Sequence, residues 1–286
     1  MTAVSMTQHL TEYRDRMNSL HQGIIQAYLL ALNDPITARG WFANLLMQVS
    51  GLEQEHNAWA STYVAEVRSV FGMNSAQEQQ MAGMANGVTR MLALDAVYVQ
   101  LGDSTAALGF GQFNDAAQAA GEALRRCDAL VPLGVDFELA NQRIMARGQM
   151  MLVAYKQACD NVGNPQAMAN ARQWAEHCFQ EAAQAGNWML AAESKAIVAS
   201  CAWVMDDRVT FSNAMGEAIQ LATNSGAMIR NLASGGQYVP LASYLQSWTW
   251  EMQGGADRTG DTSYRIRQLN DSMLENLARM TAQQPR

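Results

Sequence analysis

The chain has 286 residues, 49% of them hydrophobic, and a formal net charge of -7. This length and hydrophobic content are enough for a sizeable core. The negative charge excludes nucleic acid as the expected partner, because phosphate binding depends on clustered Lys and Arg.

The first element is predicted to be a helix of about 28 residues, because apolar residues recur at steps of three and four. These residues are Met6, Leu10, Tyr13, Met17, Leu20, Ile24, Ala27 and Ala31. The helix is expected to stop at Asn33, where Asp34 can cap a second helix and Pro35 fits its first turn.

The second helix keeps the same spacing and is expected to end near Gly72. Its seam comprises Phe42, Leu45, Val49, Leu52, His56, Trp59, Tyr63 and Val70. Two long helices joined by a tight turn must fold back as an antiparallel hairpin. Gly40 and Gly51 either weaken this helix or mark a bend or a close helix approach.

Ser75 and Glu78 have capping-box spacing and predict the start of a third helix. Its face carries Met81, Met84, Val88 and Met91. The glycine-containing segment from Gly102 to Gly111 is the expected break, which divides the chain into residues 1–101 and 102–286.

The remainder is predicted to form shorter, alanine-rich helices, because no alternating strand pattern interrupts them. The expected ranges are 113–130, 136–162, 165–186, 188–205, 207–225, 238–254 and 262–282. The sequence therefore predicts an all-α, antiparallel helical array with a long N-terminal helical hairpin, continuous along the chain.

A faint internal repeat lays Phe179, Glu181, Ala182 and Gln184 over Met215, Glu217, Ala218 and Gln220, an offset of 36. Over residues 113–226 at most, the chain resembles the tetratricopeptide family, whose repeats pair two antiparallel helices. This resemblance implies an α-α superhelix. The family's first-helix Trp, Leu-Gly and Tyr positions fall on Val198, Cys201, Ala202 and Met205, which depart from its pattern.

Glu53, Glu55 and His56 are the most tempting chemical group, since Glu53 and His56 have the Glu-x-x-His spacing of ferritin-like di-iron bundles. Such sites need a second copy, and the residues three before His9, His21 and His177 are Met6, Asn18 and Trp174. We therefore expect His56 to be a core histidine with a polar neighbour, and we expect no metal or cofactor.

Other motifs have structural interpretations. Asp206 and Asp207 are expected to begin a helix. The four cysteines (Cys127, Cys159, Cys178 and Cys201) are expected to be reduced core residues. The 19 methionines are either core residues that fill gaps or an adaptable surface for partners.

The N-terminal sequence lacks the basic start and apolar run of a secretory signal, and no run of 18 apolar residues occurs, so we expect a cytoplasmic protein without a membrane span. Lys156 and Lys195 are the only lysines. Their scarcity reflects either genomic composition or a protein injected into a host cell, where few lysines limit ubiquitin attachment.

The favoured function is a non-catalytic protein- or peptide-binding scaffold, such as a bacterial secretion-associated adaptor, chaperone or translocated effector. The alternative is an all-α enzyme with a buried pocket formed by Glu53, Glu55 and His56.

Trp250 is the predicted partner-binding residue. Leu241, Leu245, Trp248 and Met252 share one face of the helix at 238–254, and Trp250 falls on the opposite side. Trp250 therefore needs either a partner, including a second copy, or a covering layer. The expected last helix supplies such a layer through Ile266, Leu269, Met273 and Leu277.

Overall fold

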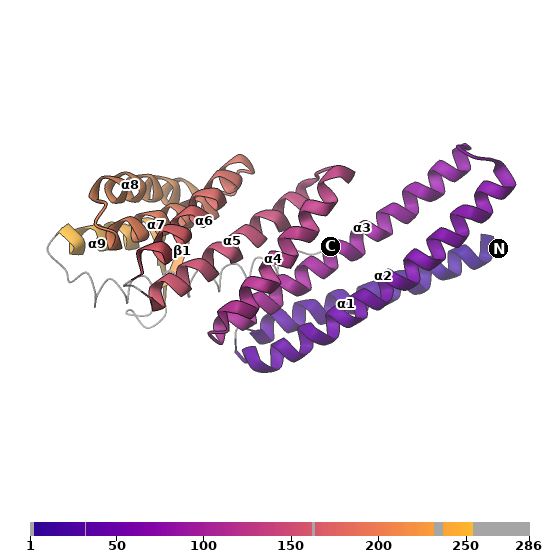
Figure 1. Ribbon diagram of the computed structural model, residues 1–286, viewed down its shortest axis with the longest axis horizontal. Coiled ribbons are helices and arrows are strands. Elements are labelled where there is room, and N and C mark those ends of the chain that lie inside the picture. The colour runs from indigo at the N-terminus through magenta and orange to yellow at the C-terminus, as the bar shows by residue number, and fades with distance from the viewer. Residues whose placement is uncertain (1–2, 32, 162–163, 232–236, 254–286) are drawn as a thin grey trace.

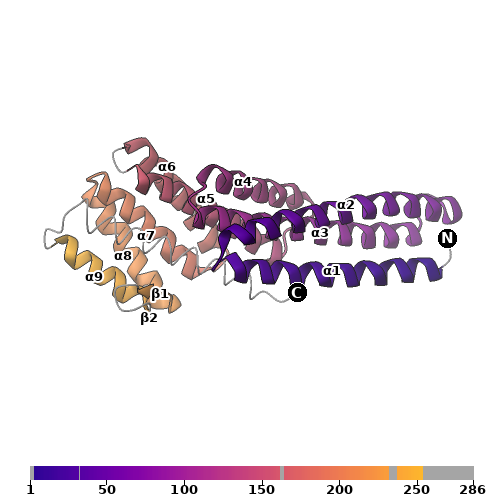
Figure 2. The same ribbon diagram turned by 90° about the horizontal axis from the view of Figure 1, so that it is seen from below.

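The computed structural model describes residues 3–31, 33–161, 164–231 and 237–253. Over these ranges the all-α fold is confirmed, with nine α-helices, one short 3-10 helix and one two-stranded sheet. Successive helices pack side by side in an elongated array, with the long N-terminal helices at one end (Figure 1). Figure 2 shows the same layers from below. None of the helices described combines the length and apolar composition needed to cross a membrane.

The helices are α1 (Ala3–Ala31), α2 (Pro35–Phe71), α3 (Ala76–Gly109), α4 (Phe113–Leu130), η1 (Val131–Leu133), α5 (Phe137–Asp160), α6 (Pro165–Gln184), α7 (Trp188–Val204), α8 (Arg208–Ser225) and α9 (Leu241–Gln253). Local capping explains several of these limits. Asp34 accepts a hydrogen bond from the backbone N of Thr37 at 3.1 Å, and Pro35 opens α2 as predicted. Ser75 caps α3 through the backbone N of Glu78 at 3.2 Å.

One short sheet was not predicted. Strand β1 (Met228–Asn231) pairs antiparallel with β2 (Gln237–Pro240). The expected helix at 238–254 therefore begins later, at Leu241. The physical reason is Pro240, which has no N–H to donate and keeps Val239 extended.

The long helices form an N-terminal core, and α3 is shared with the core of the shorter helices. Leu92 and Val99 of α3 lie in the N-terminal core, whereas Leu94 and Leu101 lie in the other. The observed break between helices is shorter than the predicted segment 102–111, because α3 continues through Gly102 to Gly109. The boundary expected after residue 101 therefore falls inside a continuous helix.

Gly102 has a packing role that the sequence did not indicate. A Cβ atom there would lie 2.2 Å from Cε1 of Phe42, whose ring is fully buried between α2 and α3. The close approach considered for Gly40 and Gly51 is absent, since a Cβ at either position would meet nothing within 4 Å.

A recurrent turn joins α3 to α4, α6 to α7 and α7 to α8. In each turn the middle residue has a positive φ: 76° at Gly111, 73° at Gly186 and 60° at Asp206. The next backbone N donates to a carbonyl five residues earlier, at 2.8–2.9 Å. This is the Schellman arrangement, which satisfies carbonyl groups at the end of the first helix. Three repeats of one turn explain why these helices stack regularly.

Candidate functional site

A cleft of about 560 Å³ opens where the start of α4 meets the end of α5 and the first turn of α6. Its lining comprises residues 111–115, Gln157, Asn161 and Ala167. This volume lies within the range of small-ligand sites in proteins. The cleft is the candidate binding site of this chain.

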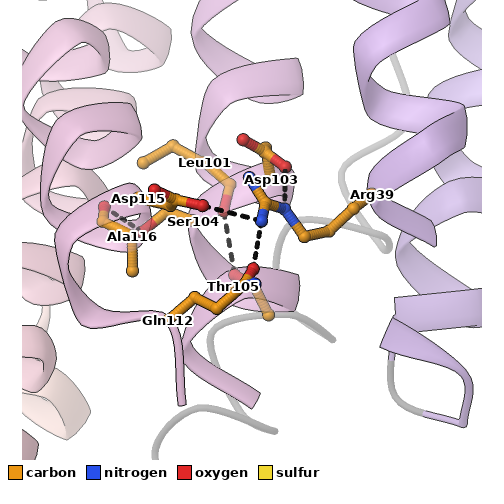
Figure 3. A network of polar contacts seen from close by, with 8 residues as sticks. All are labelled: Arg39, Leu101, Asp103, Ser104, Thr105, Gln112, Asp115 and Ala116. Carbon is orange, nitrogen blue, oxygen red and sulfur yellow. Dashed lines mark hydrogen bonds and ion pairs between the residues drawn. The ribbon is translucent and has the colours of Figure 1, made fainter. Parts of the chain in front are cut away.

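Arg39 of α2 fixes one wall of the cleft. Its Nε donates to Asp103 of α3 at 3.0 Å, and its Nη1 donates to Asp115 of α4 at 2.9 Å and to Oε1 of Gln112. Figure 3 shows the guanidinium reaching the junction of α3 and α4. The hydrogen bond to Asp103 raises the pKa of Arg39 above its already high value, although partial burial opposes this, so the group stays charged.

Buried hydroxyl groups of α3 join the same wall to α4 and α5. Ser104 donates to the carbonyl of Ala116 at 2.9 Å, and Thr105 donates to the carbonyl of Leu101 at 2.9 Å (Figure 3). Gln149 of α5 donates to Thr105 at 2.6 Å. Helices α2, α3, α4 and α5 are therefore linked behind the cleft by polar contacts.

Carboxamide side chains supply the available polar groups of the cleft. Within the described residues, the side chains of Asn114 and Gln157 make no hydrogen bond. Asn161 uses its Nδ2 in a long contact, 3.5 Å, with the carbonyl of Gln157, so its Oδ1 can accept from a ligand. The lining can therefore donate and accept hydrogen bonds without adding net charge.

A second surface feature is the apolar connection between α4 and α5, residues 131–137. Leu133, Val135 and Phe137 are 61%, 59% and 80% exposed, respectively. Arg90 of α3 holds this connection in place: its Nη1 donates to the carbonyl of Gly134 at 2.8 Å, and its Nη2 lies 2.7 Å from Asp136. We refer to residues 131–137 as the apolar loop.

Asp136 anchors the end of this apolar loop. Its carboxylate accepts from the backbone N of Leu139 at 2.9 Å and so caps α5. This backbone hydrogen bond lowers the pKa of Asp136 below its usual range; desolvation opposes it, and the hydrogen bond from Arg90 lowers the pKa further. Phe137 therefore begins a capped helix with its ring exposed.

Trp250 lies on the outer side of α9, as the helical angles predicted, and is 77% exposed. Leu241, Leu245 and Trp248 are buried on the opposite side. The side chain of Met252 and the predicted helix at 262–282 lie outside the described residues.

The structure does not bring Glu53, Glu55 and His56 together. Glu53 pairs with Arg126 of α4 at 3.2 Å, and Glu55 pairs with Arg16 of α1 at 2.6 Å. His56 is buried and contacts the carbonyl of Ala85 through Nε2 at 3.0 Å. The prediction of a core histidine with a polar neighbour is confirmed, whereas Glu53 and Glu55 are each paired with an arginine of a different helix. Within the described ranges, no group of three or more His, Cys, Asp or Glu is placed to hold a metal ion.

The cysteines and methionines take different environments. Cys127, Cys178 and Cys201 are buried and Cys159 is half-buried, all as thiols. Burial raises the pKa of Cys127 and of Cys178 to about 12. Met84 and Met91 of the predicted methionine face are exposed, whereas Met145 and Met151 of α5 are core residues. The core interpretation is therefore confirmed for Met145 and Met151, whereas Met84 and Met91 lie at the surface.

Sequence reasoning missed the cleft and the apolar loop. The cleft joins residues 111–115 to Gln157 and Asn161, which only the packing of α4 against α5 brings together. The apolar loop had a local signal: Val131, Leu133, Val135 and Phe137 lie where one predicted helix ends and the next begins, in a connection that is ordinarily polar.

The described ranges thus form an all-α helical array that carries the cleft and the exposed apolar loop. Comparison with protein-family models, curated proteins and solved structures found no match.

Proposed function

We propose that this chain is a non-catalytic helical scaffold that binds a protein or peptide partner. The apolar loop is the observation that supports the proposal. Large apolar side chains on a surface connection are unfavourable in water unless a partner covers them, and clustered apolar patches mark interaction sites more often than isolated residues do.

The attachment of the apolar loop strengthens this argument. Arg90 contacts the loop at Gly134 and Asp136, and Asp136 caps α5. Since these contacts already hold the loop, ordering it on binding costs less free energy. Such pre-organisation favours binding over a purely structural role for the exposed side chains.

The proposal is tested by affinity capture from the native cell with the full chain as bait, followed by affinity measurement with the purified partner. The double variant Val135→Ser/Phe137→Ser should weaken binding at least about tenfold, since apolar anchors dominate many interfaces. Val209→Ser is the matched control, because Val209 is 73% exposed on α8, outside the apolar loop. Equal affinity of all three proteins would contradict a role for the loop, and no specific partner at all would contradict the proposed function.

Within this function, we favour a cytoplasmic, secretion-associated adaptor, chaperone or translocated effector. The scarcity of lysine supports this class, and both lysines are engaged. Lys195 contacts Glu217 at 2.6 Å and lies 4.1 Å from the ring centroid of Phe179. Lys156 donates to the carbonyl of Leu108 at 3.4 Å. Ubiquitin conjugation in a eukaryotic extract should be slower than for Arg125→Lys, which adds an exposed amine. Equal rates would contradict the argument from lysine scarcity.

A further inference from the structure

We propose that the cleft between α4, α5 and α6 binds the main chain of an extended peptide through the carboxamides of Asn114, Gln157 and Asn161. This inference rests on the proposed function and adds to it a site and a ligand chemistry. It concerns a surface that is separate in sequence from the apolar loop.

The chemistry of the lining selects the ligand. A carboxamide carries two N–H donors and a carbonyl acceptor, so it can pair with both the C=O and the N–H of a peptide group. Within the described residues the side chains of Asn114 and Gln157 make no hydrogen bond, and the Oδ1 of Asn161 remains available. Three such side chains in one cleft match a repeating chain of amides.

The charge around the cleft favours a neutral main chain over an anion. Asp115 is the one ionisable residue of the lining, and its carboxylate is held by Arg39 at 2.9 Å. The same guanidinium is also held by Asp103 and Gln112. Because Arg39 faces the two carboxylates of Asp103 and Asp115, this group carries a net negative charge and disfavours an anionic ligand, whereas hydrogen bonds to neutral amides are not opposed by it.

Shape and rigidity agree with a peptide ligand. The cleft volume of about 560 Å³ is open to solvent along exposed residues such as Asn114 and Asn161, so a chain can enter and leave. Phe113 is half-buried at its edge and can contact an apolar side chain of the peptide. The polar contacts from Arg39 to Gln149 fix the wall behind it, which limits the entropy lost on binding.

The test uses the full chain and a phage-displayed library of random peptides about 12 residues long, long enough to exceed a cleft of this size. Selected peptides are resynthesised with a fluorophore, and their affinities are measured by fluorescence anisotropy. We expect Asn114→Ala/Gln157→Ala to weaken binding about 10-fold to 100-fold through the loss of two hydrogen bonds. Asn57→Ala/Gln77→Ala, which removes two exposed carboxamides from the distal part of α2 and α3, is the matched control and should bind like the wild type.

A second measurement separates main-chain from side-chain recognition. N-methylation of individual peptide nitrogens should weaken binding to the wild type at one or two positions and should have less effect in Asn114→Ala/Gln157→Ala. Circular dichroism and thermal midpoints establish that the variants are folded.

The inference is overturned if no peptide is selected, if Asn114→Ala/Gln157→Ala binds as tightly as the control, or if N-methylation has the same effect on both proteins. These results are distinguishable from failure of the proposed function. A purified partner that still requires Val135 and Phe137 would leave that function intact while the cleft inference fails.

Discussion

At the scale of single residues, Gly102 shows how one missing side chain sets the distance between two helices. The Phe42 ring occupies the space that a Cβ at position 102 would need. We expect Gly102→Ala to lower the free energy of unfolding by about 1–3 kcal/mol, the usual cost of overpacking. Gly51→Ala should instead raise it by roughly 0.5–1 kcal/mol, because alanine favours the helix and a Cβ there meets no neighbour. Urea denaturation of both variants measures the difference, and equal effects would contradict the packing role of Gly102.

The cysteines give a second prediction at this scale. A thiol reacts through its thiolate, and burial holds the pKa of Cys127 and of Cys178 at about 12 and also raises that of Cys201. At about pH 8, where ordinary thiols begin to ionise, a thiol reagent should therefore modify at most Cys159 rapidly in the native protein. All four thiols should react after denaturation. If rapid labelling of the native protein persists in Cys159→Ser, the core of the shorter helices opens more readily than its packing implies.

At the scale of elements, the recurrent turn places one non-glycine residue in a conformation that glycine tolerates better. Asp206 has a φ of 60° where the two equivalent turns have Gly111 and Gly186. Asp206→Gly should raise the free energy of unfolding by about 0.5–1 kcal/mol, since left-handed conformations disfavour a side chain. Gly186→Ala is the reciprocal control and should lower it by about 1 kcal/mol. A loss of stability in Asp206→Gly would mean that the exposed contact with Arg208, 3.5 Å away, matters more than the backbone.

The stabilising effect of Asp136 at the start of α5 should depend on pH. The pKa of Asp136 is lower in the folded protein than in the unfolded chain, so its stabilising effect is present above the unfolded pKa of about 3.9 and is lost as pH falls through the folded pKa. Because the side chain is 57% exposed, screening limits the effect to less than about 1 kcal/mol. The difference in urea midpoint between wild type and Asp136→Asn should shrink on acidification. A constant difference would show that only neutral capping is involved.

Local signals explain which elements could be predicted from the sequence. Asp34 with Pro35, and Ser75 with Glu78, mark helix starts through contacts within one turn, and the structure confirms both starts. Contacts between residues far apart in sequence could not be read in this way. Gly102 looks like a helix breaker until Phe42 is placed beside it. The carboxamides of the cleft are ordinary polar residues until helix packing brings them together.

At the scale of the whole molecule, α3 couples the two ends of the array. Its residues alternate between the N-terminal core and the core of the shorter helices. Because α3 belongs to both cores, loss of packing on one face of α3 also weakens the packing on its other face. The wall behind the cleft, from Arg39 on α2 to Gln149 on α5, spans this shared helix. Ligand binding in the cleft would therefore stabilise both ends of the array by mass action.

The far end of the array carries the last prediction, which concerns association of the molecule through Trp250. Burial of Leu241, Leu245 and Trp248 already docks α9 onto the core, so the exposed indole is not needed for that contact. Tryptophan is among the residues that most often anchor interfaces, because it buries a large area with few rotatable bonds. Trp250→Ala should therefore weaken partner binding or self-association at least about tenfold while the thermal midpoint stays within about 1 °C, as for most exposed substitutions. Calorimetry measures the midpoint, and binding isotherms with sedimentation velocity measure association. Thr249→Ala controls for general effects on α9. A large fall in the midpoint would identify Trp250 as a folding contact and would contradict its role as a partner-binding residue.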